Sequence, residues 1–116
     1  MRLRETQGLS PEGPPTVGAE IRKTRPALVI QNDIGNEHSP ITIVAAITSK
    51  FDEPPYPTEV ILEPEESGLP LRSAVVLNQI RSIDRQRLVK RLGRADGRTM
   101  DRVDQAIQIS LGLIKV

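Results

Sequence analysis

The sequence contains no cysteine and no tryptophan, and it has only one histidine, one phenylalanine and one tyrosine among 116 residues. Without cysteine the chain forms no disulfide, thiol nucleophile or zinc–thiolate site, which fits a reducing cytoplasm. A single histidine, His38, excludes a two-histidine ribonuclease pair and any metal site that needs two histidines. We therefore expect no metal ion, no cofactor, and a core built from Val, Ile and Leu.

Long apolar runs and several common catalytic motifs are also missing. No run approaches the ~20 apolar residues that span a bilayer, and Met1–Glu5 lacks the apolar stretch of a signal peptide. We expect a cytoplasmic protein without membrane contact. The chain has no Gly-x-x-x-x-Gly-Lys phosphate loop and no Gly-x-Ser-x-Gly nucleophile elbow.

Charge is unevenly distributed, although the net charge is only +1. Residues 1–70 carry 6 Lys/Arg against 11 Asp/Glu, whereas residues 71–116 carry 10 against 4. Most of the positive charge lies between Arg81 and Arg98. Such a patch suits a polyanion or an acidic peptide, and it is equally compatible with an ordinary solvated surface.

Short β-branched runs separated by turn-forming residues predict a mainly β chain. We predict strands at residues 27–30, 41–48, 58–62 and 73–80. Residues 83–92 fit a helical turn followed by a short strand, which gives about five strands. Prolines within 50–57 predict an exposed loop, residues 32–36 a hairpin turn, and residues 63–68 a polar loop.

The two ends of the chain differ in regularity. Apolar residues near the C-terminus follow helical spacing, and Asp96 or Thr99 is suited to cap the helix they form: Met100, Val103, Ile107, Leu111 and Ile114. Residues 1–18 hold three prolines and three glycines, which argues against a regular element. We predict an antiparallel, barrel-like sheet with a packed C-terminal helix, in one domain over 14–116 preceded by an atypical N-terminal arm at 1–13.

Four ordered motifs resemble those of the MazF/PemK family of toxins. Residues 15–33 contain P-x-x-G-x-E followed by R-P-x-L-V, and the later motifs fall at Ile43–Thr48, Pro57–Val60 and Val76–Asp84. Val103–Ile107 resembles the family's C-terminal helix. The resemblance covers roughly residues 14–116, lies close to the EndoA-like branch of the family, and is far more specific than any lone pattern.

The resemblance implies an SH3-like barrel, a homodimer, and sequence-specific, metal-independent cleavage of single-stranded RNA. A ribose 2′-hydroxyl attacks the neighbouring phosphate, which leaves a 2′,3′-cyclic phosphate and a 5′-hydroxyl. The partner implied is a MazE-like antitoxin with an extended acidic tail. The family's catalytic arginine and threonine fall on Arg25 and Thr48.

Physical chemistry supports those two positions. Because the substrate supplies the attacking hydroxyl, the enzyme needs to position and neutralise a phosphate, and a guanidinium offers planar, permanently charged donors for that task. Side chains able to contact RNA are Glu20, Ser73, Asn78, Gln79 and Arg81. Of these, Gln79 is the strongest candidate to read unstacked bases. The alternative is that these residues are ordinary loop and strand side chains.

One departure from the family concerns the first strand. The family opens with R-G-D-V/I-Y/W, whereas this chain has Gln7-Gly8-Leu9-Ser10 before the first motif. Either the N-terminal arm pairs irregularly or stability depends on a dimer. Two functional alternatives therefore accompany the ribonuclease: a CcdB-like toxin that binds DNA gyrase without catalysis, and an inactive RNA- or peptide-binding relative.

Overall fold

The computed structural model describes residues 5–9 and 25–115. This part of the chain contains six strands, three α-helices and one 3-10 turn. In chain order they are β1 (Glu5–Leu9), β2 (Arg25–Val29), α1 (Asp33–His38), β3 (Ile41–Thr48), β4 (Glu59–Leu62), α2 (Pro64–Ser67), β5 (Ser73–Asp84), the 3-10 turn (Arg85–Arg87), β6 (Leu88–Arg94) and α3 (Gly97–Ser110).

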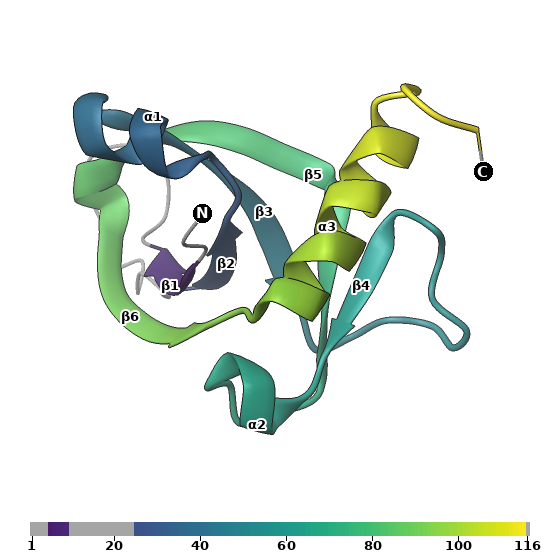
Figure 1. Cartoon of the computed structure of the whole chain (residues 1–116). Helices are drawn as coiled ribbons and strands as arrows, with labels where there is room; N and C mark the ends of the chain where they lie inside the picture. The colour runs from purple at the N-terminus through teal and green to yellow at the C-terminus, as the bar shows by residue number, and fades with distance from the viewer. Residues whose placement is uncertain (1–4, 10–24, 116) are drawn as a thin grey trace, which may run out of the picture.

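The strands form a single antiparallel sheet in the order β4-β5-β3-β2-β1-β6. The sheet curls, so that β6 swings from the end of β5 back to β1, while α3 lies across β4 and β5 (Figure 1). This arrangement confirms the predicted mainly β fold with a C-terminal helix. Among the residues described, no helix is long and apolar enough to cross a membrane.

Two apolar clusters lie on opposite faces of the sheet because side chains alternate along a strand. Leu28 and Ala45 face α3 in the larger cluster, together with Val103 of the helix. Their strand neighbours face the curled interior in a smaller cluster formed by Ala27, Val29, Val44 and Ile83, with Leu88 packed against it. The cores are aliphatic, as the composition predicts.

Strand β1 corrects the prediction that residues 1–18 contain no regular element. Glu5–Leu9 pairs with β2 on one side and β6 on the other. The β6 register shifts between Thr6 and Gln7 and again between Gly8 and Leu9. The structure therefore has the irregular pairing that the sequence left open. Gly8, one of the glycines counted as strand breakers, is tolerated here because the adjacent register shift relaxes the regular ladder.

Two predicted loops are short helices. The hairpin predicted at residues 32–36 is wrong, since Asn32 caps α1 by accepting a hydrogen bond from the Gly35 amide at 2.8 Å. The polar loop at 63–68 contains α2, which begins at Pro64 and ends at Gly68 in the left-handed conformation. Both have recognisable caps, but single-turn helices carry too little apolar periodicity to reveal themselves in sequence.

Helix α3 has Asp96 as its N-cap, the first of the two caps that the sequence offered, while Thr99 lies within the helix. Its buried face is formed by Thr99, Met100, Val103 and Ala106. The helix ends at Ser110, earlier than the predicted apolar stripe, so Leu111 and Ile114 lie beyond it and are 56% and 39% exposed.

Gly68 packs against the backbone of β6, at the point where the end of α2 approaches that strand closely. A Cβ added there would lie 1.9 Å from the Leu92 carbonyl oxygen, and its φ of +76° disfavours any L side chain. We expect Gly68→Ala to lower the free energy of unfolding by more than about 2 kcal/mol in urea denaturation. Gly97→Ala is the matched control, because a Cβ there meets nothing within 4 Å. It should be neutral or stabilise by up to about 1 kcal/mol; similar losses in both variants would contradict this packing.

The Asp96 cap predicts a pH dependence of stability. The Thr99 backbone N–H donates to Asp96 Oδ1 at 2.8 Å, and this bond holds the pKa of the carboxyl below its usual range. A depressed folded-state pKa stabilises the fold above the unfolded-state value of about 3.9 and loses that effect as pH falls. We expect the difference in free energy of unfolding between wild type and Asp96→Asn, measured in urea from neutral pH to below about pH 3.9, to shrink as the pH falls. A difference that does not change with pH would contradict the role of the charge.

Candidate active site

The antiparallel pairing of β2 with β3 places the two predicted catalytic positions at the same end of these strands. Ala27 pairs with Ala46 and Val29 with Val44 in an antiparallel register. The paired residues end at Ala27 and Ala46, so Arg25, the first residue of β2, and Thr48, the last residue of β3, lie two residues further on at the same end of the strand pair. Arg25 is exposed and Thr48 half-buried.

A wide bulge in β5 adds a second wall to this region. Ala46 pairs with Val76, whereas the neighbouring Ala45 pairs with Ile80, so three residues of β5 have no facing partner on β3. Skipping an odd number of residues reverses which face the following side chains occupy. Val75 and Leu77 thus pack toward α3, while Arg81 pairs with Val44 on the opposite face.

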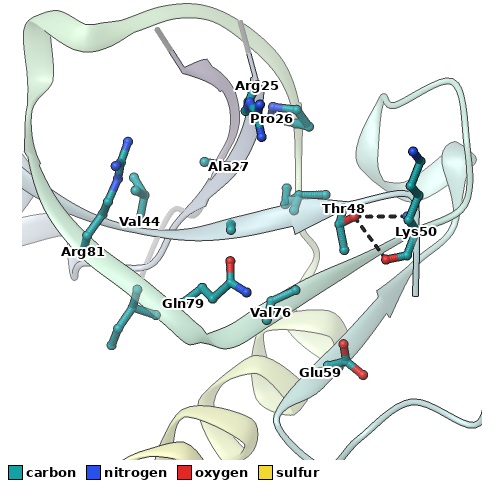
Figure 2. A pocket seen from close by; sticks show the side chains of 13 residues that line it. Arg25, Pro26, Ala27, Val44, Thr48, Lys50, Glu59, Val76, Gln79 and Arg81 are labelled. Carbon is teal, nitrogen blue, oxygen red and sulfur yellow. Dashed lines mark hydrogen bonds between the residues drawn. The ribbon is translucent and has the colours of Figure 1, made fainter. Parts of the chain in front are cut away.

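These strands enclose a cavity of about 620 Å³, which we call the central cavity. Figure 2 shows its lining side chains arranged around the middle of β3. The lining comes from β2, β3, β4 and β5 and from the loop that follows β3: Arg25, Pro26, Ala27, Val44, Ala46, Ile47, Thr48, Lys50, Glu59, Val76, Gln79, Ile80 and Arg81. Arg25, Thr48, Gln79 and Arg81, four of the residues predicted from sequence, therefore share one cavity.

The cavity is predominantly cationic. Arg25, Lys50 and Arg81 are exposed along its lining, and Glu59 is the one acidic residue among the lining side chains. Glu59 Oε1 accepts a hydrogen bond from the Tyr56 amide at 2.8 Å, and the Glu59 amide donates to the Tyr56 carbonyl at 2.9 Å. This reciprocal pair fixes the carboxylate at the point where the chain enters β4. A cavity with this balance of charge attracts an anion such as a phosphodiester.

Thr48 engages the first residues of the loop through its hydroxyl. Its Oγ1 accepts from the Lys50 amide at 3.1 Å and donates to the Lys50 carbonyl at 3.2 Å (Figure 2). Both distances are at the long end for bonds to a hydroxyl. The hydroxyl is thus held at the rim of the cavity and can turn its proton toward a bound anion by giving up the bond to the carbonyl.

The other predicted RNA-contacting residues are placed differently. Ser73 is 4% exposed, does not line the cavity, and donates from Oγ to the Leu71 carbonyl at 2.9 Å. Asn78 lies in the β5 bulge and is exposed, but it does not line the cavity. Glu20 lies outside the described residues.

Sequence reasoning missed Lys50 and Glu59 as cavity residues. Both flank the proline-rich loop, and each follows or begins a strand. Their position was the available signal. When a loop joins two strands of one sheet, charged residues at its two ends lie close to the ends of those strands. Within the described residues, no group of three or more His, Cys, Asp or Glu is arranged to hold a metal ion.

Comparison with known proteins decides the family. The family model of the PemK-like, MazF-like toxins of type II toxin–antitoxin systems matches residues 11–111. The chain belongs to this family. Endoribonuclease EndoA of Bacillus subtilis strain 168 is 49% identical over 100 residues, which cover 86% of each chain. The match places the chain close to the EndoA branch that the motifs indicated.

Solved structures of the family share the fold. Mycobacterium tuberculosis toxin MazF-mt6 superposes with a TM-score of 0.78 at 20% identity, covering 96% of this chain and 99% of that one. The MazE–MazF complex of Deinococcus radiodurans (Form-II) gives a TM-score of 0.75 at 26% identity, covering 95% and 94%. Both agree with the sheet and C-terminal helix described above.

Proposed function

We propose that this MazF/PemK toxin is an endoribonuclease that cuts single-stranded RNA in the central cavity without a metal ion. The 2′-hydroxyl of the substrate attacks the adjacent phosphorus, the bond to the 5′-oxygen breaks, and a 2′,3′-cyclic phosphate and a 5′-hydroxyl remain. The proton lost by the 2′-hydroxyl is balanced by the proton gained by the 5′-oxygen. The presence of Arg25 and Thr48 together in the lining of one cationic cavity carries this proposal.

The composition of the cavity favours this class of reaction over hydrolysis through an enzyme nucleophile. The described lining contains no cysteine, serine or histidine, and its polar groups are cations, a threonine hydroxyl, an amide and one carboxylate. Such a set positions and neutralises a phosphate, which is the contribution required when the nucleophile belongs to the substrate. The 49% identity to a protein named as an endoribonuclease supports RNA as the substrate.

Arg25 and Thr48 have distinct roles in this proposal. The Arg25 guanidinium stays protonated at any ordinary pH, so it stabilises the charge that develops on the phosphate oxygens and does not serve as a base. Thr48 donates a hydrogen bond from its hydroxyl to a phosphate oxygen after giving up its hydrogen bond to the Lys50 carbonyl. Each contact becomes stronger as negative charge grows, and the transition state therefore gains more than the ground state.

Removing either group should slow cleavage without abolishing the fold. We expect Arg25→Ala to lower kcat about 100- to 1000-fold, the usual cost of losing one donor to a developing oxyanion. Thr48→Val, which keeps the shape and removes the hydroxyl, should lower kcat by a similar order. Cleavage of a labelled single-stranded RNA in EDTA measures both, and Thr48→Ser should retain much of the activity.

Two controls make this outcome decisive. The same oligonucleotide with 2′-deoxyribose at the cleaved position should bind and remain intact, because it lacks the attacking group. Wild-type cleavage rates in both Arg25→Ala and Thr48→Val would refute the site. If RNA is never cut while DNA gyrase supercoiling is inhibited, the CcdB-like alternative holds instead.

The proposal extends to partners and location. We expect a homodimer, a cognate MazE-like antitoxin and a cytoplasmic location, since mRNA and an antitoxin would both be met there. The structure of a MazE–MazF complex from Deinococcus radiodurans, which superposes over 95% of this chain, supports the choice of partner class. The basic stretch between Arg81 and Arg98 suits an acidic tail.

The β5 bulge supplies a matched pair for testing RNA contact in the cavity. Gln79 lines the cavity, whereas the adjacent amide of Asn78 is exposed outside it. We expect Gln79→Ala to raise KM for RNA about 2- to 10-fold, the value of one or two hydrogen bonds to a base, and Asn78→Ala to leave KM within about twofold. A larger effect at Asn78 than at Gln79 would mean that RNA follows a different path.

A further inference from the structure

The loop between β3 and β4, residues 49–58, connects two charged residues of the central cavity. Lys50 follows β3, and Glu59 begins β4; both line the cavity. The intervening residues do not line it. The position of the two charged ends therefore depends on how the middle of the loop is held.

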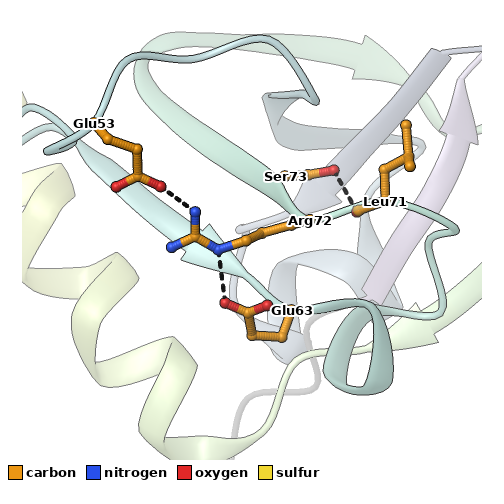
Figure 3. Close-up of polar contacts among 5 residues, drawn as sticks. All are labelled: Glu53, Glu63, Leu71, Arg72 and Ser73. Carbon is orange, nitrogen blue, oxygen red and sulfur yellow. Dashed lines mark hydrogen bonds and ion pairs between the residues drawn. The ribbon is translucent and has the colours of Figure 1, made fainter.

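Arg72 contacts two residues of this loop, Phe51 and Glu53, and also Glu63 beyond β4; Figure 3 shows its bonds to the two carboxylates. Its Nη1 donates to Glu53 Oε1 in an ion pair, and its Nε donates to Glu63 Oε1 at 2.9 Å. The guanidinium carbon also lies 5.6 Å from the centre of the Phe51 ring, within the range of a cation–π contact. We call Arg72, Glu53, Glu63 and Phe51 the Arg72 clamp.

The clamp joins the loop to rigid parts of the sheet. Arg72 immediately precedes β5, whose first residue, Ser73, is buried and bonded to the Leu71 carbonyl. Glu63 lies between β4 and α2 and is the N-cap residue of that helix. Phe51 and Glu53 are the loop's own members. A single guanidinium thus ties the loop to the β4–α2 junction and to the start of β5.

Electrostatics favours the clamped arrangement. The pKa of Arg72 is raised above its ordinary value, first by the hydrogen bond to Glu53 and then by the bond to Glu63. The three side chains are 46%, 53% and 38% exposed, and isolated pairs at such exposure contribute little. Here two carboxylates and a ring share one cation, so the entropy of ordering the arginine is lost only once for three contacts.

We propose that Arg72 is a positioning residue that holds the 49–58 loop in place, so that Lys50 and Glu59 are pre-arranged for RNA. This inference rests on the proposed function. No member of the clamp lines the cavity, so its loss removes no group from the lining and acts through the loop. A loop that samples other positions binds RNA in proportion to the fraction that is correctly placed, which raises the apparent Kd.

The kinetic test separates binding from chemistry. We expect Arg72→Ala to raise KM for single-stranded RNA about 3- to 10-fold, in keeping with the loss of a small network of exposed ion pairs. The value of kcat should stay within about twofold. Arg72→Lys should recover part of the loss by keeping one ion pair, and the exchange Glu53→Arg with Arg72→Glu should recover more than either single change.

A control must remove the same charge elsewhere, because losing any cation weakens binding to RNA. Lys115→Ala serves this purpose, since Lys115 is exposed beyond the end of α3, lies outside the basic stretch and does not line the cavity. An equal rise in KM in Lys115→Ala would overturn the proposal in favour of bulk charge. A fall in kcat with unchanged KM in Arg72→Ala would overturn it as well.

Limited proteolysis tests the clamp independently of catalysis. Trypsin cleaves after Lys50, at the base of the loop, and mass spectrometry identifies this cut among the others. We expect the cut after Lys50 to appear about 3- to 10-fold faster in Arg72→Ala than in wild type or Lys115→Ala, matching the loss of exposed ion pairs. Equal rates would overturn the clamp even if RNA is cleaved, whereas a faster cut in a protein that cleaves no RNA would refute only the proposed function.

Discussion

The register between β2 and β3 is the constraint on which the rest of the site depends. It pairs two small residues, Ala27 and Ala46, and it brings Arg25 and Thr48, at the ends of the two strands, to the lining of the same cavity. Side chains as small as alanine leave room above the sheet, and the cavity lies over them. On the reverse face the same strands bury Leu28 and Ala45 against α3. A one-residue slip would exchange the two faces and so cost the core and the site together.

The remaining walls of the cavity come from segments with less regular geometry. The β5 bulge turns Arg81 to the cavity side, and the 49–58 loop brings charged residues to the rim at its two ends. Rigid strands therefore hold the groups proposed for chemistry, while a bulge and a loop hold the groups proposed for contacting the rest of the RNA. This division matches a common pattern, in which a fixed scaffold carries recognition elements of variable shape.

Much of the fold was predictable because its longest elements have strong periodicity. The β3 boundaries and the Asp96 cap of α3 agree with the structure, since an eight-residue β-branched run and a capped amphipathic helix are clear local signals. Strand β1 was not predicted, because its glycine-containing sequence becomes a strand only through pairing with two neighbours. In the site, the motifs located Arg25 and Thr48, but the burial of Ser73 and the orientation of Gln79 depend on the bulge, which has no signature in a single sequence.

The number of residues in the bulge also decides which face of the sheet the later side chains of β5 occupy. Between the partner of Ala46 and the partner of Ala45 the strand carries three extra residues, and it is this odd number that sends Arg81 and Ile83 to one side and Ile80 to the other. Substitutions within the bulge would change the side chains that line the cavity while preserving which face of the sheet each later residue of β5 occupies. Deleting one residue of the bulge would turn Arg81 toward α3 and Ile80 away from it. Within the family, we therefore expect this segment of β5 to accept substitutions more readily than insertions or deletions.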